Sequence, residues 1–191
     1  MADSGLDALV HEARAGATWA LAELYREFQP ALVGFLAGLA GGDAEDLAAE
    51  TWVDMAQYLA RFDGGGRDFR RVLFTVARRR AVDHRRKQGR RRTDPTNRIE
   101  DLQPPDSGDP ARAVEDLDAS RRAIRDIRAL LPQSQAEVVL LRVVAGLSVG
   151  EVARVVNRPP AAVSVLQTRG LRRLATKLGD PTGSLSTPRP S

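Results

Sequence analysis

The sequence predicts an all-α protein made of two small helical domains joined by a flexible linker, with a helix-turn-helix in the C-terminal domain. Apolar residues recur at helical spacing through most of the 191-residue chain. A proline-containing stretch without that periodicity separates the two periodic halves. We therefore expect a first domain over residues 1–90, a linker over 91–112, a second domain over 113–179 and a disordered tail over 180–191.

Three amphipathic helices are expected in the first half, after a short leading helix over residues 6–13. The first has its apolar residues between positions 21 and 39, and Pro30 should kink it rather than end it. Asp43 is a good N-cap for the second helix. Three glycines at 64–66 force a loop, and the third helix starts near Phe69 and runs into an arginine cluster.

The second half carries stronger helix boundary signals. A helix ending at Pro132 is followed by two capping boxes, Ser134 with Glu137 and Ser148 with Glu151, which start two short helices. Asn157 suits a left-handed turn, and Pro159–Pro160 favours the first turn of a last helix. The apolar face expected on that helix consists of Val163, Leu166, Leu171, Leu174 and Leu178. Two helices joined by a short turn, the second longer and basic, are typical of a helix-turn-helix.

Composition excludes several function classes. The chain has no cysteine and two histidines, so disulfides and thiolate metal sites are impossible, and we expect no metal site and no cofactor. No apolar run approaches the roughly 20 residues that span a bilayer, so no membrane insertion is expected. The N-terminus does not resemble a secretory signal, which favours a cytoplasmic protein.

Charge is strongly segregated along the chain. Residues 1–60 have a net charge of −8, and residues 61–100 have a net charge of +9. The basic block suits a polyanion such as nucleic acid, although such a run is also typical of a solvated helix face. On the last helix, Ser164, Gln167 and Thr168 could reach base edges while the later basic residues contact phosphates. A helix hairpin with a solvated basic face is the alternative.

Two blocks of the chain resemble a known family. Residues 43–51 (DAEDLAAET), Arg61–Phe62–Asp63 with the glycine loop, and residues 69–83 (FRRVLFTVARRRAVD) resemble region 2 of the extracytoplasmic-function (ECF) sigma factors of bacterial RNA polymerase, in the sigma-70 superfamily. Residues 130–148, 151–153 and 169–174 resemble their region 4. The resemblance covers about residues 18–178 in the family's order.

This resemblance implies a promoter-specificity subunit that performs no chemistry. Such a protein binds core RNA polymerase, at the clamp of the largest subunit and the flap of the second largest, recognises minus-thirty-five and minus-ten promoter elements, and promotes strand opening. An anti-sigma factor is a further implied partner. The implied polymerase-binding residues are Asp46, Glu50 and Asp54. The implied minus-ten residues are Phe62, Asp63, Gly65, Arg71, Arg78, Arg79, Asp83 and Arg86. The implied minus-thirty-five residues are Arg158, Ser164, Gln167, Thr168, Arg169, Arg172, Arg173 and Lys177.

Two other function classes remain open at this stage. A stand-alone helix-turn-helix regulator would act without polymerase, but it would not explain an acidic helix and an arginine-rich helix ahead of a linker. A nucleic-acid enzyme would need a carboxylate cluster. Asp43, Glu45 and Asp46 could hold Mg²⁺, but acids at the start of a helix are more simply explained as caps. Co-migration with core polymerase distinguishes the sigma-factor hypothesis from the stand-alone regulator and the nucleic-acid enzyme.

Overall fold

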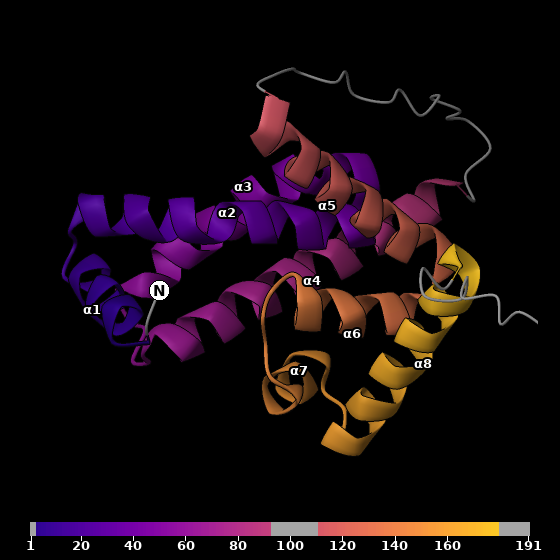
Figure 1. The fold of residues 1–191 in the computed structure, drawn as a ribbon. Helices are drawn as coiled ribbons and strands as arrows, with labels where there is room; N and C mark the ends of the chain where they lie inside the picture. Colours follow the sequence, from indigo (N-terminus) through magenta and orange to yellow (C-terminus); the bar gives the residue numbers. More distant parts are fainter. Residues whose placement is uncertain (1–2, 93–110, 180–191) are drawn as a thin grey trace, which may run out of the picture.

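The computed structural model describes residues 3–92 and 111–179, and every regular element in these ranges is helical, as predicted (Figure 1). The helices are Asp3–Arg14 (α1), Thr18–Ala40 (α2), Ala44–Leu59 (α3), Gly66–Arg92 (α4), Ala111–Leu130 (α5), Gln133–Val143 (α6), Val149–Val156 (α7) and Pro160–Leu178 (α8), with a 3-10 turn, η1 (Gly41–Asp43), before α3. The expected linker is shortened at both ends, because α4 reaches Arg92 and α5 begins at Ala111. The rest of it and the expected tail lie outside the described residues.

An aromatic core joins α2, α3 and α4. The rings of Phe28 and Phe69 have centroids 5.7 Å apart, and those of Phe35 and Phe74 meet edge to face at 5.5 Å. Both are favourable aromatic geometries beyond simple burial. Helix α2 continues through the exposed Pro30, so the prediction that this proline does not end the helix is confirmed. This long helix therefore provides one continuous apolar surface for its neighbours.

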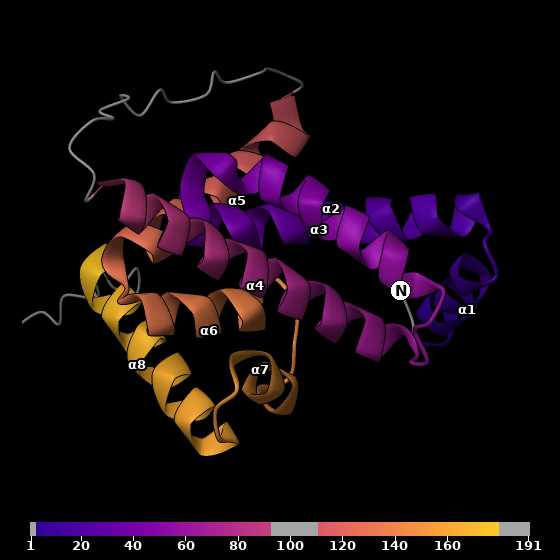
Figure 2. The ribbon, with the colours of Figure 1, turned by 180° about the vertical axis from the view of Figure 1, so that it is seen from behind.

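The two halves of the chain share a single buried core, in which α5 and α6 pack on α2. Small residues allow this close approach: a Cβ at Gly34 would lie 3.0 Å from Ile124 Cδ1, and one at Gly38 would overlap Leu140. Helix α4 crosses the molecule with α3 on one side and α6 and α7 on the other (Figure 2). The C-terminal half is thus seated directly against the helix that carries the arginine cluster.

Two of the predicted helix caps lack their capping hydrogen bond, although Asp43 does occupy the N-cap position of α3. Asp43 precedes α3 but makes no capping hydrogen bond, since its carboxylate lies 2.9 Å from His84 Nε2 and accepts from Gln88 Nε2 at 3.1 Å. Helix α6 begins after Pro132 without a side-chain cap, so the predicted box of Ser134 with Glu137 does not form. In both cases the acidic side chain interacts instead with residues distant in sequence: Asp43 with His84 and Gln88, and Glu137 with Arg78.

The apolar face of α8 differs from the predicted one. Val163 and Gly170 are buried, whereas Leu171 and Leu178 are exposed. A Cβ at Gly170 would lie 2.9 Å from Val139 Cγ2 of α6, so the glycine marks the closest approach of the two helices. The face of α8 that is buried is the one whose backbone comes closest to α6. The spacing of large apolar residues does not predict this face, because Gly170 has no side chain to count.

Candidate functional site

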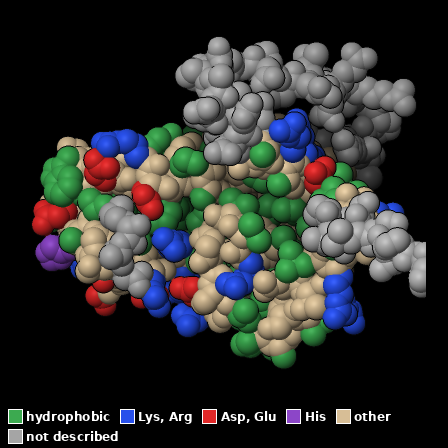
Figure 3. Space-filling view, in the orientation of Figure 1, with side chains coloured by type: hydrophobic (Ala, Val, Ile, Leu, Met, Phe, Trp, Pro, Cys, Tyr) green, Lys and Arg blue, Asp and Glu red, His purple; other side chains and the backbone are tan. Residues whose placement is uncertain are grey.

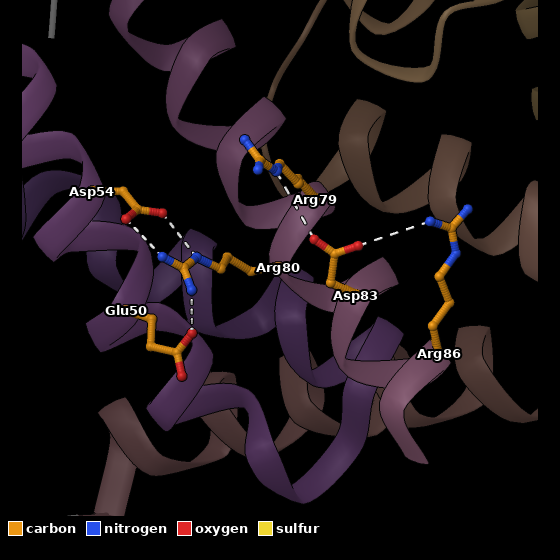
Figure 4. Close-up of polar contacts among 6 residues, drawn as sticks. All are labelled: Glu50, Asp54, Arg79, Arg80, Asp83 and Arg86. Atoms are coloured by element: carbon orange, nitrogen blue, oxygen red, sulfur yellow. Dashed lines mark hydrogen bonds and ion pairs between the residues drawn. The ribbon is translucent and has the colours of Figure 1, made fainter. Parts of the chain in front are cut away.

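The outer face of α3 presents the predicted carboxylates, and one arginine of α4 organises two of them. Arg80 Nε and Nη2 donate to the two oxygens of Asp54 at 2.8 and 2.6 Å. Its Nη1 donates to Glu50 at 2.7 Å (Figure 4). Bidentate hydrogen bonding to Asp54 outweighs partial burial and, with the charges of Asp54 and Glu50, raises the pKa of Arg80 above its ordinary value. Asp46, one turn away, is exposed.

The glycine run at 64–66 is held against α1 and the core. Phe62, predicted to contact DNA, is 3% exposed and packs against Phe69, so it supports the loop from below. Asp63 is exposed at the surface of the loop. Helix α4 begins at Gly66 rather than at the predicted Phe69. Gly64 and Gly65 are partly exposed and Gly66 is buried, so the solvent-accessible part of this loop is Asp63 with the first two glycines rather than the Phe62 ring.

Arg71, another predicted minus-ten residue, lies one turn into α4. Its Nη2 donates to Asp68 at 2.8 Å, while its Nε is buried without a partner. A buried donor left unpaired is costly, and because this Nε is enclosed by the protein it does not reach a partner at the surface.

Three successive arginines in α4 take three different directions, as residues about 100° apart on a helix must. Arg78 Nε donates to the buried carboxylate of Glu137 in α6 at 2.6 Å. Arg79 is 84% exposed and lies 3.9 Å from Asp83. Arg80 turns to α3, as described above. The predicted group is therefore split, with Arg78 covered by the second half and Arg79 open to solvent.

The end of α4 adds further cations to this surface. Arg86 is largely exposed and lies 3.9 Å from Asp83, which it shares with Arg79 (Figure 4). Arg85, which the sequence analysis did not select, is half-buried close to Glu137 and Arg78. Burial lowers the pKa of Arg85, the charge of Glu137 opposes that change, and Arg78 adds to it.

The predicted helix-turn-helix is present in α7 and α8. The capping box is confirmed: the Ser148 amide donates to Glu151 Oε2 at 2.6 Å, and the Glu151 amide donates to Ser148 Oγ at 3.3 Å. Asn157 is left-handed with φ 52°, and Pro160 opens α8, both as predicted. The caps and the turn fix the angle at which α8 is presented.

Glu151 also interacts electrostatically with arginines of the first half of the molecule. Partial burial disfavours its ionised form, but the hydrogen bonds from Ser148 and the charges of Arg67 and Arg70 hold the pKa of Glu151 below its ordinary value. Arg67 and Arg70 belong to the first turns of α4. A second carboxylate of the C-terminal half thus lies in the positive field of α4.

Most of the polar residues predicted to read duplex DNA lie on the open side of α8 or in the turn that precedes it. The exposed members of that set are Arg158, Ser164, Thr168, Arg169, Arg172, Arg173 and Lys177. Figure 3 shows Lys and Arg side chains along the outer edge of α8. Three members of the predicted set have internal partners: Ser164 Oγ donates to the Pro160 carbonyl at 3.2 Å, Gln167 Oε1 accepts from Arg142 Nε at 3.2 Å, and Arg173 Nε donates to the Leu130 carbonyl at 2.9 Å. Arg173 therefore ties α8 to the end of α5.

The structure adds residues that the sequence analysis missed. Arg80, Glu137 and Arg142 each hold a predicted site residue in place. Helical position could have identified Arg80, since it projects away from Arg78 and Arg79. Across residues 3–92 and 111–179, the structure contains no group of three acidic or histidine side chains placed to hold a metal ion. None of the described helices combines the length and hydropathy needed to cross a membrane.

Comparison with known proteins accounts for this arrangement. The family model "Sigma-70 region 2" matches residues 24–91, and "Sigma-70, region 4" matches residues 121–174. The ECF RNA polymerase sigma factor SigD of Mycobacterium tuberculosis is 32% identical over 179 residues, which cover 91% of this chain and 84% of SigD. The ECF RNA polymerase sigma factor BldN of Streptomyces coelicolor is 35% identical over 175 residues, which cover 90% of this chain and 65% of BldN.

The fold is also found among solved structures. The sigma factor RpoE of Bartonella quintana, solved in complex with the anti-sigma factor NepR, superposes with a TM-score of 0.62 at 22% identity. The match covers 82% of this chain and 96% of that one. It supports the helical architecture described above.

Proposed function

The chain belongs to the sigma-70 family, as an ECF RNA polymerase sigma factor, and from this premise we propose how its surfaces divide the work of promoter recognition. As a sigma factor it is the promoter-specificity subunit that binds core RNA polymerase and promoter DNA for transcription initiation. We assign it no chemical step of its own, since nucleotide addition belongs to the polymerase. Its place of action is then the cytoplasm, where polymerase works.

The exposed acidic face of α3 is the polymerase-docking surface in this proposal. Asp46 and Glu50 point away from the core, and Arg80 holds Asp54 and Glu50 in fixed positions. Fixed carboxylates lose less side-chain entropy on binding a basic surface than free ones do. We assign this face to the clamp of the largest subunit, and the α5–α8 half to the flap of the second largest.

The loop at 63–66 and the exposed arginines of α4 form the proposed minus-ten surface. Arg79 and Arg86 are solvent-exposed cations on the same helix that the loop leads into. Cations that bind phosphates beside a surface for an unstacked base are the components that single-strand capture needs. Arg78 joins this surface only when it leaves Glu137, which requires the two halves to separate.

Helix α8 is the proposed reader of the minus-thirty-five duplex. Its N-terminal half offers Ser164 and Thr168 to base edges, and Arg169 and Arg172 to phosphates. Among the described residues, α8 packs on α5, α6 and α7 of its own half, so this proposal needs no opening for duplex recognition.

One observation carries the proposal: an acidic docking helix and two outward basic surfaces, on α4 and on α8, occur in one chain. The test is to mix the full chain with core RNA polymerase, follow co-migration, and measure transcription from promoters selected from a genomic library. We expect both association and start-site selection. Tight duplex binding without any association with polymerase would instead support a stand-alone helix-turn-helix regulator.

A matched pair of charge reversals sharpens this test. Asp46→Lys changes the proposed docking face, whereas Glu12→Lys makes the same change on exposed α1. We expect Asp46→Lys to weaken polymerase binding by about tenfold or more, because like charges at an interface cost a few kcal/mol. Equal effects of the two variants would contradict the docking role of α3.

An anti-sigma protein is the proposed regulator. The RpoE structure with a similar fold was solved with the anti-sigma factor NepR. We therefore expect a partner of that class to compete with core polymerase for this chain, and a pull-down from the native cell would identify it.

A further inference from the structure

The glycine run before α4 is tightly packed, in contrast to the flexible loop that three glycines suggest. None of Gly64, Gly65 and Gly66 is among the residues with positive φ. Glycine is needed here because neighbouring side chains leave no room for a Cβ atom. A Cβ at Gly64 would lie 2.6 Å from Phe62 Cζ, and one at Gly66 would overlap Leu6 of α1. Substitution at either position would thus force neighbouring groups to shift.

Helix α1 supplies the group that fixes the loop. Asp7 Oδ1 accepts a hydrogen bond from the backbone amide of Gly66, the first residue of α4, at 2.6 Å. The first amides of a helix lack intrahelical partners, and a carboxylate there is favoured by the helix dipole. Asp7 therefore caps α4 from a different helix, 59 residues earlier in the chain.

The same carboxylate also limits the middle glycine. A Cβ at Gly65 would lie 2.6 Å from Asp7 Oδ1, so the capping contact and the absence of a side chain at Gly65 depend on each other. The contact is anchored by the apolar side of α1, where Leu6 and Val10 are 3% and 1% exposed. Helix α1 precedes the residues that match sigma-70 region 2, so the holding group lies outside the matched segment.

We propose that Asp7 is a positioning residue for minus-ten recognition: its carboxylate holds the backbone of Gly64–Gly66 in the one shape that accepts the preferred unstacked base. This inference rests on the proposed role of the loop in the minus-ten surface. A negative group at the helix N-terminus also keeps a DNA phosphate from occupying that position, which leaves the loop to contact a base.

The test measures base preference rather than stability alone. Holoenzyme is assembled from core polymerase and full-length wild type, Asp7→Ala, Asp7→Asn or the α1 control Glu12→Ala. Each holoenzyme is used to select binding sequences from a pool of single-stranded DNA randomised over the minus-ten positions. Its affinity is then measured for oligonucleotides that carry each of the four bases at each selected position. Binding of the minus-thirty-five duplex and the unfolding midpoint are measured in parallel.

We expect Asp7→Ala to reduce the preference for the best base at one or two positions by about five- to thirtyfold, the change that corresponds to a lost capping hydrogen bond. Asn keeps an acceptor but lacks the charge, so Asp7→Asn should lie between Ala and wild type. Glu12→Ala and duplex binding should be unchanged. If Asp7→Ala does not fold, Asp7→Asn provides the same comparison.

Two outcomes separate this inference from the proposed function. If wild-type holoenzyme selects no minus-ten sequence, the assigned role of the loop is wrong. If wild type selects a sequence and the folded Asp7 variants keep its base ratios, even with a lowered unfolding midpoint, then Asp7 is only a structural cap and the inference is overturned.

Discussion

The ion pair between Arg78 and Glu137 is a direct polar link between the two halves, and its removal gives a sharp test. Glu137 has 8% of its side chain exposed, and Arg78 has 30%. Removing one partner of a buried ion pair typically costs about 3–5 kcal/mol, because the other charge stays buried. Arg85 is also close to Glu137, so we expect Arg78→Ala to cost ~3 kcal/mol of unfolding free energy, at the low end of that range.

A double-mutant cycle isolates the cause. Glu137→Gln keeps an acceptor for Arg78, so it should cost about 1–2 kcal/mol. In the background of Arg78→Ala, the same change should recover about 1 kcal/mol, since a neutral amide is less costly to leave unpaired than a carboxylate. Arg79→Ala is the matched control: its 3.9 Å exposed pair should contribute less than about 0.5 kcal/mol.

Urea unfolding followed by helical circular dichroism measures all four variants, with linear extrapolation and comparison of the slopes. The reasoning is refuted if Arg78→Ala costs no more than Arg79→Ala, or if Glu137→Gln destabilises the Arg78→Ala protein further. Either result would mean that the buried carboxylate does not depend on Arg78.

Four further predictions concern other residues. Gly38→Ala should cost about 1–3 kcal/mol in urea unfolding, because the added methyl overlaps Leu140 between α2 and α6. The pKa of Glu151 is lowered in the folded protein, so its contribution to stability is present above its ordinary pKa and is lost as the pH falls through the folded pKa. Glu151→Gln should therefore make the unfolding free energy fall less between about pH 5 and pH 3 than it does in the wild type. Arg172→Ala should lower the slope of log affinity for minus-thirty-five duplex against log salt by about one, with unfolding unchanged. Arg173→Ala should instead also lower the unfolding free energy, by about 1 kcal/mol, because its Nε donates to the Leu130 carbonyl.

Local signals in the sequence were sufficient for the helices and for the helix-turn-helix. Ser148 with Glu151, Asn157 and Pro160 each act through backbone groups within a few residues, so their roles follow from spacing alone. The resemblance to ECF sigma factors, carried by residues 43–83 and 130–174, identified the family that the comparisons confirmed. These parts of the prediction did not require tertiary structure.

Partners across the chain were not predictable. Glu137 fits the spacing of a capping box with Ser134, but Arg78 binds it from the other half. In the sequence the arginines at 78–80 form one basic run, yet they have different partners because a helix turns by about 100° per residue. Which arginine meets which acid depends on how α4 lies between α3 and α6, and periodicity carries no information on that.

Glycines were the other source of error. The run at 64–66 suggests a flexible loop, but a Cβ at Gly65 or Gly66 would meet α1, and one at Gly64 would meet Phe62 and Asp68 of the same segment. Gly170 likewise lies where α8 closely approaches α6. Glycine is required at these positions because neighbouring atoms occupy the space that a side chain would fill. The sequence alone does not show which atoms those are.

The close contact of α2 with α5 and α6 has a consequence for the lifetime of the protein in the cell. If the halves part in water, the surface around Gly34 and Gly38, with Ile124 and Leu140 opposite, becomes a contiguous apolar patch. Such a patch promotes self-association and recognition by chaperones and proteases. Opening is therefore tolerable only while another protein covers that patch, and the pool of free sigma factor is preserved by remaining closed.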